Sequence, residues 1–254
     1  MARAARARSE SGFYHVILRG NGRQILFECD ADRLGFLELL RDSFREGDIT
    51  LLAWCLMDNH VHLLVEDTRE ALSCTMQKVA TTYALQYNTR SGHIGHVFQQ
   101  RFHSFPIEDD SYLLEAMRYI HNNSSKAGVA SAASYRWSSY HEYLGESLWG
   151  QRFADTRLLL EMLGGVDEFV RFSLDETVDD SYQPNLRPRI PDDAAAGILA
   201  EVLADLPPSR LKSVERDRRD AVLLELKRAG LSIRQIERLT GIGRNIVARA
   251  GRWQ

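Results

Sequence analysis

The stretch from Trp54 to Val65 constrains the fold more than any other part of the sequence. Two apolar runs rich in strand-forming residues flank Asp58-Asn59, a dipeptide typical of a tight hairpin turn. The second run contains His60 and His62, one residue apart. Side chains at positions i and i+2 of a strand point to the same face, roughly 7 Å apart along the chain. The stretch therefore predicts an antiparallel hairpin that presents two imidazoles side by side.

A same-face pair of histidines has two interpretations. Neutral imidazole is the commonest protein ligand for divalent ions, so the pair can supply half of a metal site. A bare His-x-His pair is more often two partly exposed strand histidines with no metal role. Further ligands elsewhere in the chain must decide between these interpretations.

The order of the predicted elements indicates the fold class. Apolar periodicity and turn residues predict strands at 14–18, 49–57, 60–66 and 101–108, and helices at 33–45, 72–88 and 111–122. We expect Asp30 or Asp32 to cap the first helix. The β-α-β-β-α-β order, followed by one more helix, is that of an α+β, ferredoxin-like fold. We expect the histidine strand in the middle of the antiparallel sheet, with one face left for the last helix.

That last helix carries a second candidate group. Tyr119 and Asn123 are four residues apart and so share a helical face. An amide oxygen is a suitable ligand for Mg²⁺ or Mn²⁺ beside imidazoles. A phenol, with its ordinary pKa of about 10, is a weak nucleophile that a nearby metal would activate. The alternative is that Tyr119 is a core aromatic and Asn123 only ends the helix, while His121 falls off this face.

The bulk composition excludes several classes of protein. Three scattered cysteines do not form a disulfide framework, and the basic residues 1–8 lack the apolar stretch of a signal peptide. No apolar run approaches the length of about 20 residues that spans a bilayer. We therefore expect a cytoplasmic protein with no membrane partner. The net charge of −3 argues against a uniformly basic surface.

The later chain changes sharply in charge. Residues 166–205 carry ten acidic side chains and three arginines, whereas residues 207–254 carry twelve lysines and arginines and five acids. Prolines at 184, 188 and 191 predict a linker near residues 179–193. We expect domains at 1–165, 166–208 and 209–254, the middle one being an acidic helical and linker segment. The acidic segment either forms an ordinary solvated surface or covers a basic surface of the protein when DNA is absent.

Three short helices are predicted in the basic C-terminal segment, at 220–230, 232–241 and 242–250. This layout resembles a helix-turn-helix DNA-binding domain. In that geometry we expect Arg234 to contact a phosphate. We expect the major groove to be contacted by Arg244, Asn245 and Arg249. A small helical dimerisation module is the alternative.

Five motifs occur in an order that resembles a known family. They span residues 14–22, 56–65, 95–102, 118–123 and 137–140. Together they resemble the single-tyrosine HUH transposases, specifically the REP-associated tyrosine transposase branch, over roughly residues 3–175. The resemblance implies a catalytic domain that nicks and rejoins single-stranded DNA beside a hairpin.

The resemblance also implies roles for individual residues. His60 and His62 match the HUH metal ligands, Asn123 matches the third ligand, and Tyr119 matches the nucleophile that forms a 5′-phosphotyrosine. The implied cofactor is Mg²⁺ or Mn²⁺. One departure is the turn after Asn123, where Ser124-Ser125-Lys126 replaces the usual Pro-Val-Arg. We therefore expect this turn to hold the implied metal site less rigidly than the family pattern does.

Hairpin recognition implies contacts to phosphates and bases. The candidates are basic residues on the N-terminal arm and beside the motifs: Arg3, Arg6, Arg8, Arg19, Arg101, Arg118 and Lys126. Each is equally typical of a solvated surface. Trp137 and Tyr140 are expected to pack on the core in preference to stacking on a base. We expect the C-terminal domain to grip duplex stem DNA, and we expect a monomer.

Two other functions fit parts of the sequence. One is a catalytically idle DNA-binding regulatory protein that keeps the transposase fold. The other is a single-strand or RNA-binding ferredoxin-like module, which the lack of an aromatic pair on the histidine strand disfavours.

Overall fold

The computed structural model describes residues 7–174, 190, 192–204, 206–231, 233–243, 246–247 and 250. Two compact units make up the chain. The first combines residues 1–106 with 114–184, and the second combines residues 107–113 with 185–254. Arg3, Arg6, Arg244, Asn245, Arg249 and almost all of the predicted linker lie outside the described residues.

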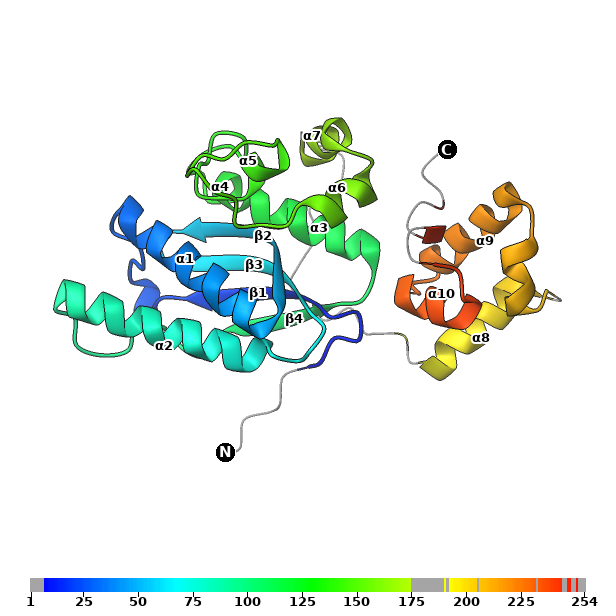
Figure 1. Cartoon of the computed structure of the whole chain (residues 1–254), viewed down its shortest axis with the longest axis horizontal. Coiled ribbons are helices and arrows are strands. Elements are labelled where there is room, and N and C mark those ends of the chain that lie inside the picture. Colours follow the sequence, from blue (N-terminus) through cyan, green and yellow to red (C-terminus); the bar gives the residue numbers. More distant parts are fainter. Residues whose placement is uncertain are drawn as a thin grey trace. The chain divides into compact units, whose positions relative to one another are not determined.

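A four-stranded antiparallel sheet forms the centre of the first unit (Figure 1). Its strands are β1 (Phe13–Arg19), β2 (Ile49–Met57), β3 (His60–Asp67) and β4 (His103–Ile107), in the order β2-β3-β1-β4. The α+β fold with this ferredoxin-like strand order is confirmed, and the histidine strand β3 lies between β2 and β1 as predicted. β4 is shorter than predicted, since it begins at His103 rather than at Arg101.

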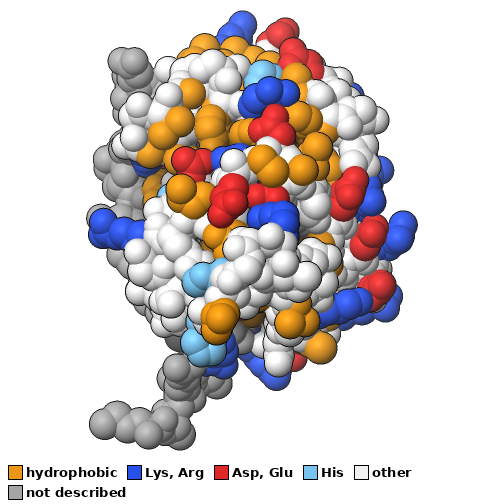
Figure 2. Space-filling view, turned by 90° about the vertical axis from the view of Figure 1, so that its left-hand side faces the viewer, with side chains coloured by type: hydrophobic (Ala, Val, Ile, Leu, Met, Phe, Trp, Pro, Cys, Tyr) orange, Lys and Arg blue, Asp and Glu red, His pale blue; other side chains and the backbone are white. Residues whose placement is uncertain are grey.

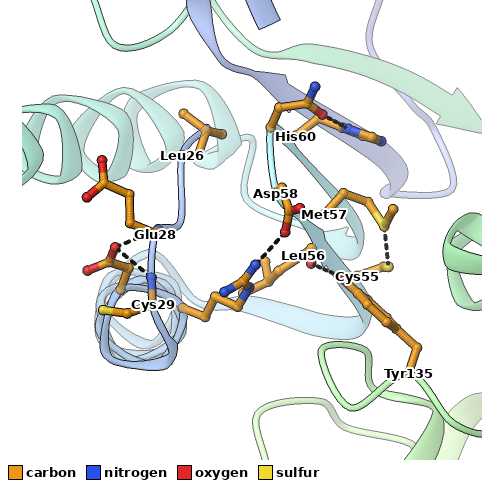
Figure 3. Close-up of polar contacts among 12 residues, drawn as sticks. Leu26, Glu28, Cys29, Cys55, Leu56, Met57, Asp58, His60 and Tyr135 are labelled. Atoms are coloured by element: carbon orange, nitrogen blue, oxygen red, sulfur yellow. Dashed lines mark hydrogen bonds and ion pairs between the residues drawn. The ribbon is translucent and has the colours of Figure 1, made fainter. Parts of the chain in front are cut away.

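The turn between β2 and β3 is held from three sides. The backbone N–H of Leu26 donates to the Asp58 carbonyl at 2.7 Å, and that of Gly20 donates to the Asn59 carbonyl at 2.9 Å. The Arg33 guanidinium contacts the Asp58 carboxylate at 2.5 Å (Figure 3). These bonds fix the point at which β3 starts, and therefore the position of His60.

Helices α1 (Asp30–Gly47) and α2 (Leu72–Ser91) pack on one side of the sheet (Figure 1). The N-cap of α1 is Cys29, so the prediction of Asp30 or Asp32 was wrong. Asp32 lies three residues inside the helix and its carboxylate accepts from the Cys29 backbone N–H at 3.3 Å. The face of α2 predicted to be apolar is buried, from Leu72 to Tyr87.

Further helices follow β4 in the chain. They are α3 (Asp110–His121), α4 (Asn123–Lys126), α5 (Tyr140–Tyr143), α6 (Arg157–Leu163) and α7 (Val166–Leu174). The segment before α5 pairs with the edge of β2, where the N–H of Leu56 donates to the Trp137 carbonyl at 2.9 Å. Trp137 is 5% exposed and Tyr140 is 2% exposed, so both pack in the core as expected.

The second unit is helical and has its own apolar core. It contains α8 (Asp192–Leu203), the 3₁₀ turn η2 (Pro208–Ser213), α9 (Arg216–Arg228) and α10 (Ile233–Thr240). Leu199 of α8, Leu226 of α9 and Ile236 of α10 belong to one buried cluster. α8 therefore packs with the C-terminal helices, although the sequence places it in the acidic segment 166–208.

Charged side chains of both signs are interspersed over the face of the first unit shown in Figure 2, with hydrophobic side chains between them. This face is not uniformly basic, in keeping with the net charge of −3. Among the residues that the structure describes, no helix combines the length and the apolarity needed to cross a membrane.

Candidate functional site

His60 and His62 lie side by side on β3. Their ring centroids are 5.0 Å apart and their planes are nearly perpendicular, at 79°. His62 is 1% exposed, whereas His60, at the start of the strand, is partly open to solvent. The strand spacing therefore brings the two imidazoles together as predicted.

The ring of His60 is oriented by its neighbour Asn59. The His60 Nδ1 atom lies 2.7 Å from the Asn59 amide oxygen (Figure 3). The Asn59 amide nitrogen donates to the Arg23 carbonyl at 3.5 Å, which places the amide oxygen toward His60. An amide oxygen only accepts, so the hydrogen of a neutral His60 is on Nδ1. Its Nε2 atom keeps a lone pair that can bind a metal.

A third histidine, His15, belongs to the same cluster. It is fully buried on β1, and its Nε2 atom lies 2.9 Å from Nδ1 of His62. In the ladder between β1 and β3, Ile17 is opposite His62, which puts His15 diagonally across from it. Our sequence analysis missed His15, because only the strand register shows that these two residues meet.

Tyr119 of α3 lies against this cluster. Its ring centroid is 5.8 Å from that of His62 and 5.8 Å from that of His15, both in edge-to-face geometry. The Lys126 ammonium lies 4.2 Å from the centre of the Tyr119 ring. Tyr119 is partly exposed. The ring distances therefore bring the predicted nucleophile and the predicted metal-binding histidines into one cluster.

Asn123 is held by the backbone of Tyr119. Its amide nitrogen donates to the Tyr119 carbonyl at 2.8 Å, and the side chain is 8% exposed. Because a carbonyl oxygen can only accept, this bond fixes which end of the amide is nitrogen. The amide oxygen of Asn123 is then the end that can serve as a metal ligand.

Burial keeps the histidines of the cluster neutral. It lowers the pKa of His60 to about 4, with a further lowering by Arg19 and a partial opposing effect of Asp58. Burial also lowers the pKa of His62 well below its usual value, reinforced by His15, His60 and Arg19. The pKa of His15 falls to about 3 for the same reason. Neutral imidazole is the form that binds metal ions.

The donor set of the site fits a hard divalent ion only if Asn123 takes part. Among the described residues, no group of three or more His, Cys, Asp and Glu is arranged to hold a metal. The candidate set has two imidazole nitrogens and one amide oxygen, which leaves coordination positions for phosphate or water. This mixed set suits Mg²⁺ or Mn²⁺.

The predicted DNA contacts differ in their distance from this cluster. Arg19 is exposed and lies opposite His60 in the ladder of β1 and β3, so its charge is next to the histidines. Arg101 is exposed just before β4. Arg118 instead packs on α7, with its guanidinium carbon 5.7 Å from the Phe172 ring centre.

Two further predicted contacts are in the N-terminal arm and in the second unit. Arg8 forms an exposed ion pair with Glu70 at 2.9 Å. Arg234 lies in α10, but its side chain is outside the described residues.

His121 lies in the core, away from the predicted ligand set. Its Nε2 atom is 2.8 Å from the Ser139 hydroxyl, and its ring contacts Tyr140, Tyr143 and Phe169 at 5.1 to 5.7 Å. Its position on α3 therefore turns it toward the core, as the helical spacing predicted.

Comparison with known proteins shows what the first part of the chain is similar to. Residues 9–123 match the family model described as "Transposase IS200 like". The matched segment is similar to IS200-like transposases, and it includes both histidines, Tyr119 and Asn123. No curated protein matches.

Two solved structures are similar to the chain. One is described as the structure of a REP-associated tyrosine transposase bound to a REP hairpin; it is 17% identical, with a TM-score of 0.49, over 61% of this chain and 94% of that one. The other, described as a putative transposase from Deinococcus radiodurans, is 18% identical, with a TM-score of 0.34, over 50% of this chain and 92% of that one.

Proposed function

We propose that this protein is a metal-dependent endonuclease and strand transferase that acts on single-stranded DNA beside a hairpin. The observation that carries the proposal is the contact of the Tyr119 ring with the neutral histidine cluster, at 5.8 Å from His62. A metal ion within reach of the scissile phosphate would polarise its oxygens and assist attack by the phenol.

The proposed roles follow from the site. His60 and His62 would bind Mg²⁺ or Mn²⁺ through their Nε2 atoms, and Asn123 through its amide oxygen. A bound ion would polarise a phosphate oxygen and neutralise developing charge. Arg19, beside His60 in the ladder, would contact a flanking phosphate.

The covalent step uses the chain's own phenol. The Tyr119 oxygen attacks the scissile phosphorus and loses its proton, and the bond from phosphorus to the 3′-oxygen breaks. The departing oxygen takes up a proton to become a 3′-hydroxyl, and the 5′-phosphate stays on Tyr119. Attack by another 3′-hydroxyl on this phosphotyrosine reverses the step and joins the strands.

The DNA substrate is proposed from the five motifs and their order. Hairpin recognition would use Arg19 and Lys126 near the cluster, Arg101 just before β4 and Arg118 near α7. We further propose that the C-terminal helical unit binds the duplex stem, in a helix-turn-helix manner, through Arg234, Arg244, Asn245 and Arg249. Arg3, Arg6 and Arg8 would add contacts from the N-terminal arm.

A labelled hairpin oligonucleotide from the DNA flanking the gene tests this function. It is incubated with the full-length protein and Mg²⁺ or Mn²⁺, and a covalent protein–DNA band is sought on a denaturing gel. We expect a metal-dependent band that disappears in Tyr119→Phe and in the double variant His60→Ala, His62→Ala. Tight binding of the hairpin without adduct or nick would instead establish an idle regulatory protein.

A further inference from the structure

We infer that His15 is a positioning residue, which holds His62 in the tautomer that offers Nε2 to a metal ion. This inference rests on the proposed function, because it concerns the same metal site. Its starting observation is the 2.9 Å contact between His15 Nε2 and His62 Nδ1.

The two metal-binding histidines differ in how their tautomers are set. The partner of His60 is an amide oxygen, which can only accept a hydrogen bond, so the tautomer of His60 follows from its partner. The partner of His62 is another imidazole nitrogen, which can either donate or accept. The contact alone therefore allows two arrangements of the hydrogen.

Only one arrangement leaves His62 able to bind a metal through Nε2. If His15 donates, the hydrogen of a neutral His62 must sit on Nε2, where it blocks the ligand atom. If His62 donates from Nδ1, its Nε2 keeps the lone pair, and His15 carries its hydrogen on Nδ1. A metal-binding histidine commonly donates its second N–H to an acceptor in this way, and loss of such acceptors weakens metal affinity about 10- to 100-fold.

The surroundings of His15 hold its ring in the orientation that this bond requires. The residue is fully buried, and its ring packs against Phe105 at 6.3 Å and against Tyr119 at 5.8 Å between centroids. The same ring therefore contacts the proposed nucleophile and the proposed ligand. Displacing His15 would disturb both.

Two variants separate the acceptor role of His15 from its packing. His15→Phe fills the space but removes the acceptor. In His15→Gln the side-chain amide oxygen can reach roughly where Nε2 stood and accept from His62. Mn²⁺ affinity of the full-length protein, measured without DNA by electron paramagnetic resonance, should fall about 10- to 100-fold in His15→Phe and recover largely in His15→Gln.

The control is His103→Phe, the same substitution at an exposed histidine of β4, which should leave Mn²⁺ affinity unchanged. The melting temperature of each variant shows whether it is folded. Nitrogen-15 spectra of the histidine side chains in the metal-free protein, assigned with His62→Ala, should show the hydrogen of His62 on Nδ1.

Finding that hydrogen on Nε2 would overturn the inference. An unchanged Mn²⁺ affinity in folded His15→Phe would also overturn it, while leaving the proposed metal site in place. If the wild-type protein binds no Mn²⁺, the proposed metal site fails and the role of His15 fails with it.

Discussion

The histidine cluster of the first unit, formed around His15, His60 and His62, and the apolar core of the second unit bury side chains of opposite character. In the second unit the buried cluster described by the structure is aliphatic throughout, and includes Leu199, Leu226 and Ile236. In the first unit, His15, His62 and Asn123 are buried, each with a polar partner.

The two clusters differ in how their buried side chains are stabilised. An aliphatic core is stabilised by burial without directional contacts. A buried polar group costs free energy unless it is hydrogen-bonded, so its partners fix its orientation. In the buried polar cluster, hydrogen bonds therefore fix the positions of individual atoms. In the aliphatic cluster, only the shape of the packed side chains is fixed.

The largest expected effect comes from removing a ligand from the polar cluster. We predict that His60→Ala weakens Mn²⁺ binding by more than about 100-fold, because one of the two proposed nitrogen ligands is lost. His60 is partly exposed, so the variant should still fold. Titration with Mn²⁺, with exposed His103→Ala as the control, measures this. Equal affinities in the two variants would remove His60 from the site.

A truncation in the aliphatic core should have the reverse pattern. Leu226 is fully buried, and Leu226→Ala should lower the free energy of unfolding of the second unit by about 2 to 5 kcal/mol. Mn²⁺ affinity should be unchanged. Denaturant unfolding monitored by circular dichroism checks this, with Ile246→Ala, at a side chain 43% exposed, as the milder control. A loss of metal binding would show that the two cores are not independent.

A buried carboxylate in the first unit tests whether a buried polar group can contribute to stability without belonging to the histidine cluster. Glu142 accepts hydrogen bonds from the Trp54 indole N–H at 3.1 Å and from the backbone N–H groups of Phe153 and Ala154 at 3.0 and 2.7 Å. In Glu142→Gln, one of the two oxygens becomes an NH₂ group that faces a donor. We predict a loss of about 1.5 to 3 kcal/mol in the free energy of unfolding.

The matched control for Glu142→Gln is Glu146→Gln. Glu146 is half-exposed and contacts His141 at 2.7 Å. An exposed pair contributes little, so this change should cost less than about 1 kcal/mol. Similar losses in the two variants would contradict the role assigned to the buried carboxylate.

The smallest expected effect is at Lys126, on the exposed edge of the polar cluster. Its ammonium lies 4.2 Å from the Tyr119 ring centre. Lys126→Gln removes this cation and should slow adduct formation about two- to fivefold. Lys126→Arg should keep most of the rate. Rates measured at two salt concentrations would show whether the lysine acts on the phosphate, since that contribution weakens with salt.

Much of the fold could be predicted from the sequence, because local signals dominate there. The Asp58-Asn59 turn, the alternation along the strands and the apolar face of α2 each depend on neighbours in the chain. The position of Tyr119 beside the histidine cluster followed from the motifs. The N-cap of α1 was mispredicted, because Cys29 takes the position that an aspartate usually fills and Asp32 contributes from inside the helix.

The missed features depend on contacts between distant segments. The bond between His15 and His62 joins residues 47 positions apart and follows from the register of β1 against β3. The packing of α8 with the C-terminal helices likewise depends on a shared core, whereas the acidic composition of residues 166–208 grouped this helix with the linker. Neither has a signal in the local pattern of residues.

The most direct test of the central claim identifies the atom that carries the DNA. A hairpin oligonucleotide with a break that lets the released strand diffuse away is incubated with protein and Mn²⁺, and the adduct is digested and analysed by mass spectrometry. We predict a nucleotide linked by its 5′-phosphate to the peptide that contains Tyr119. A phosphate on another residue, or a cleaved strand without any protein adduct, would contradict the proposed mechanism.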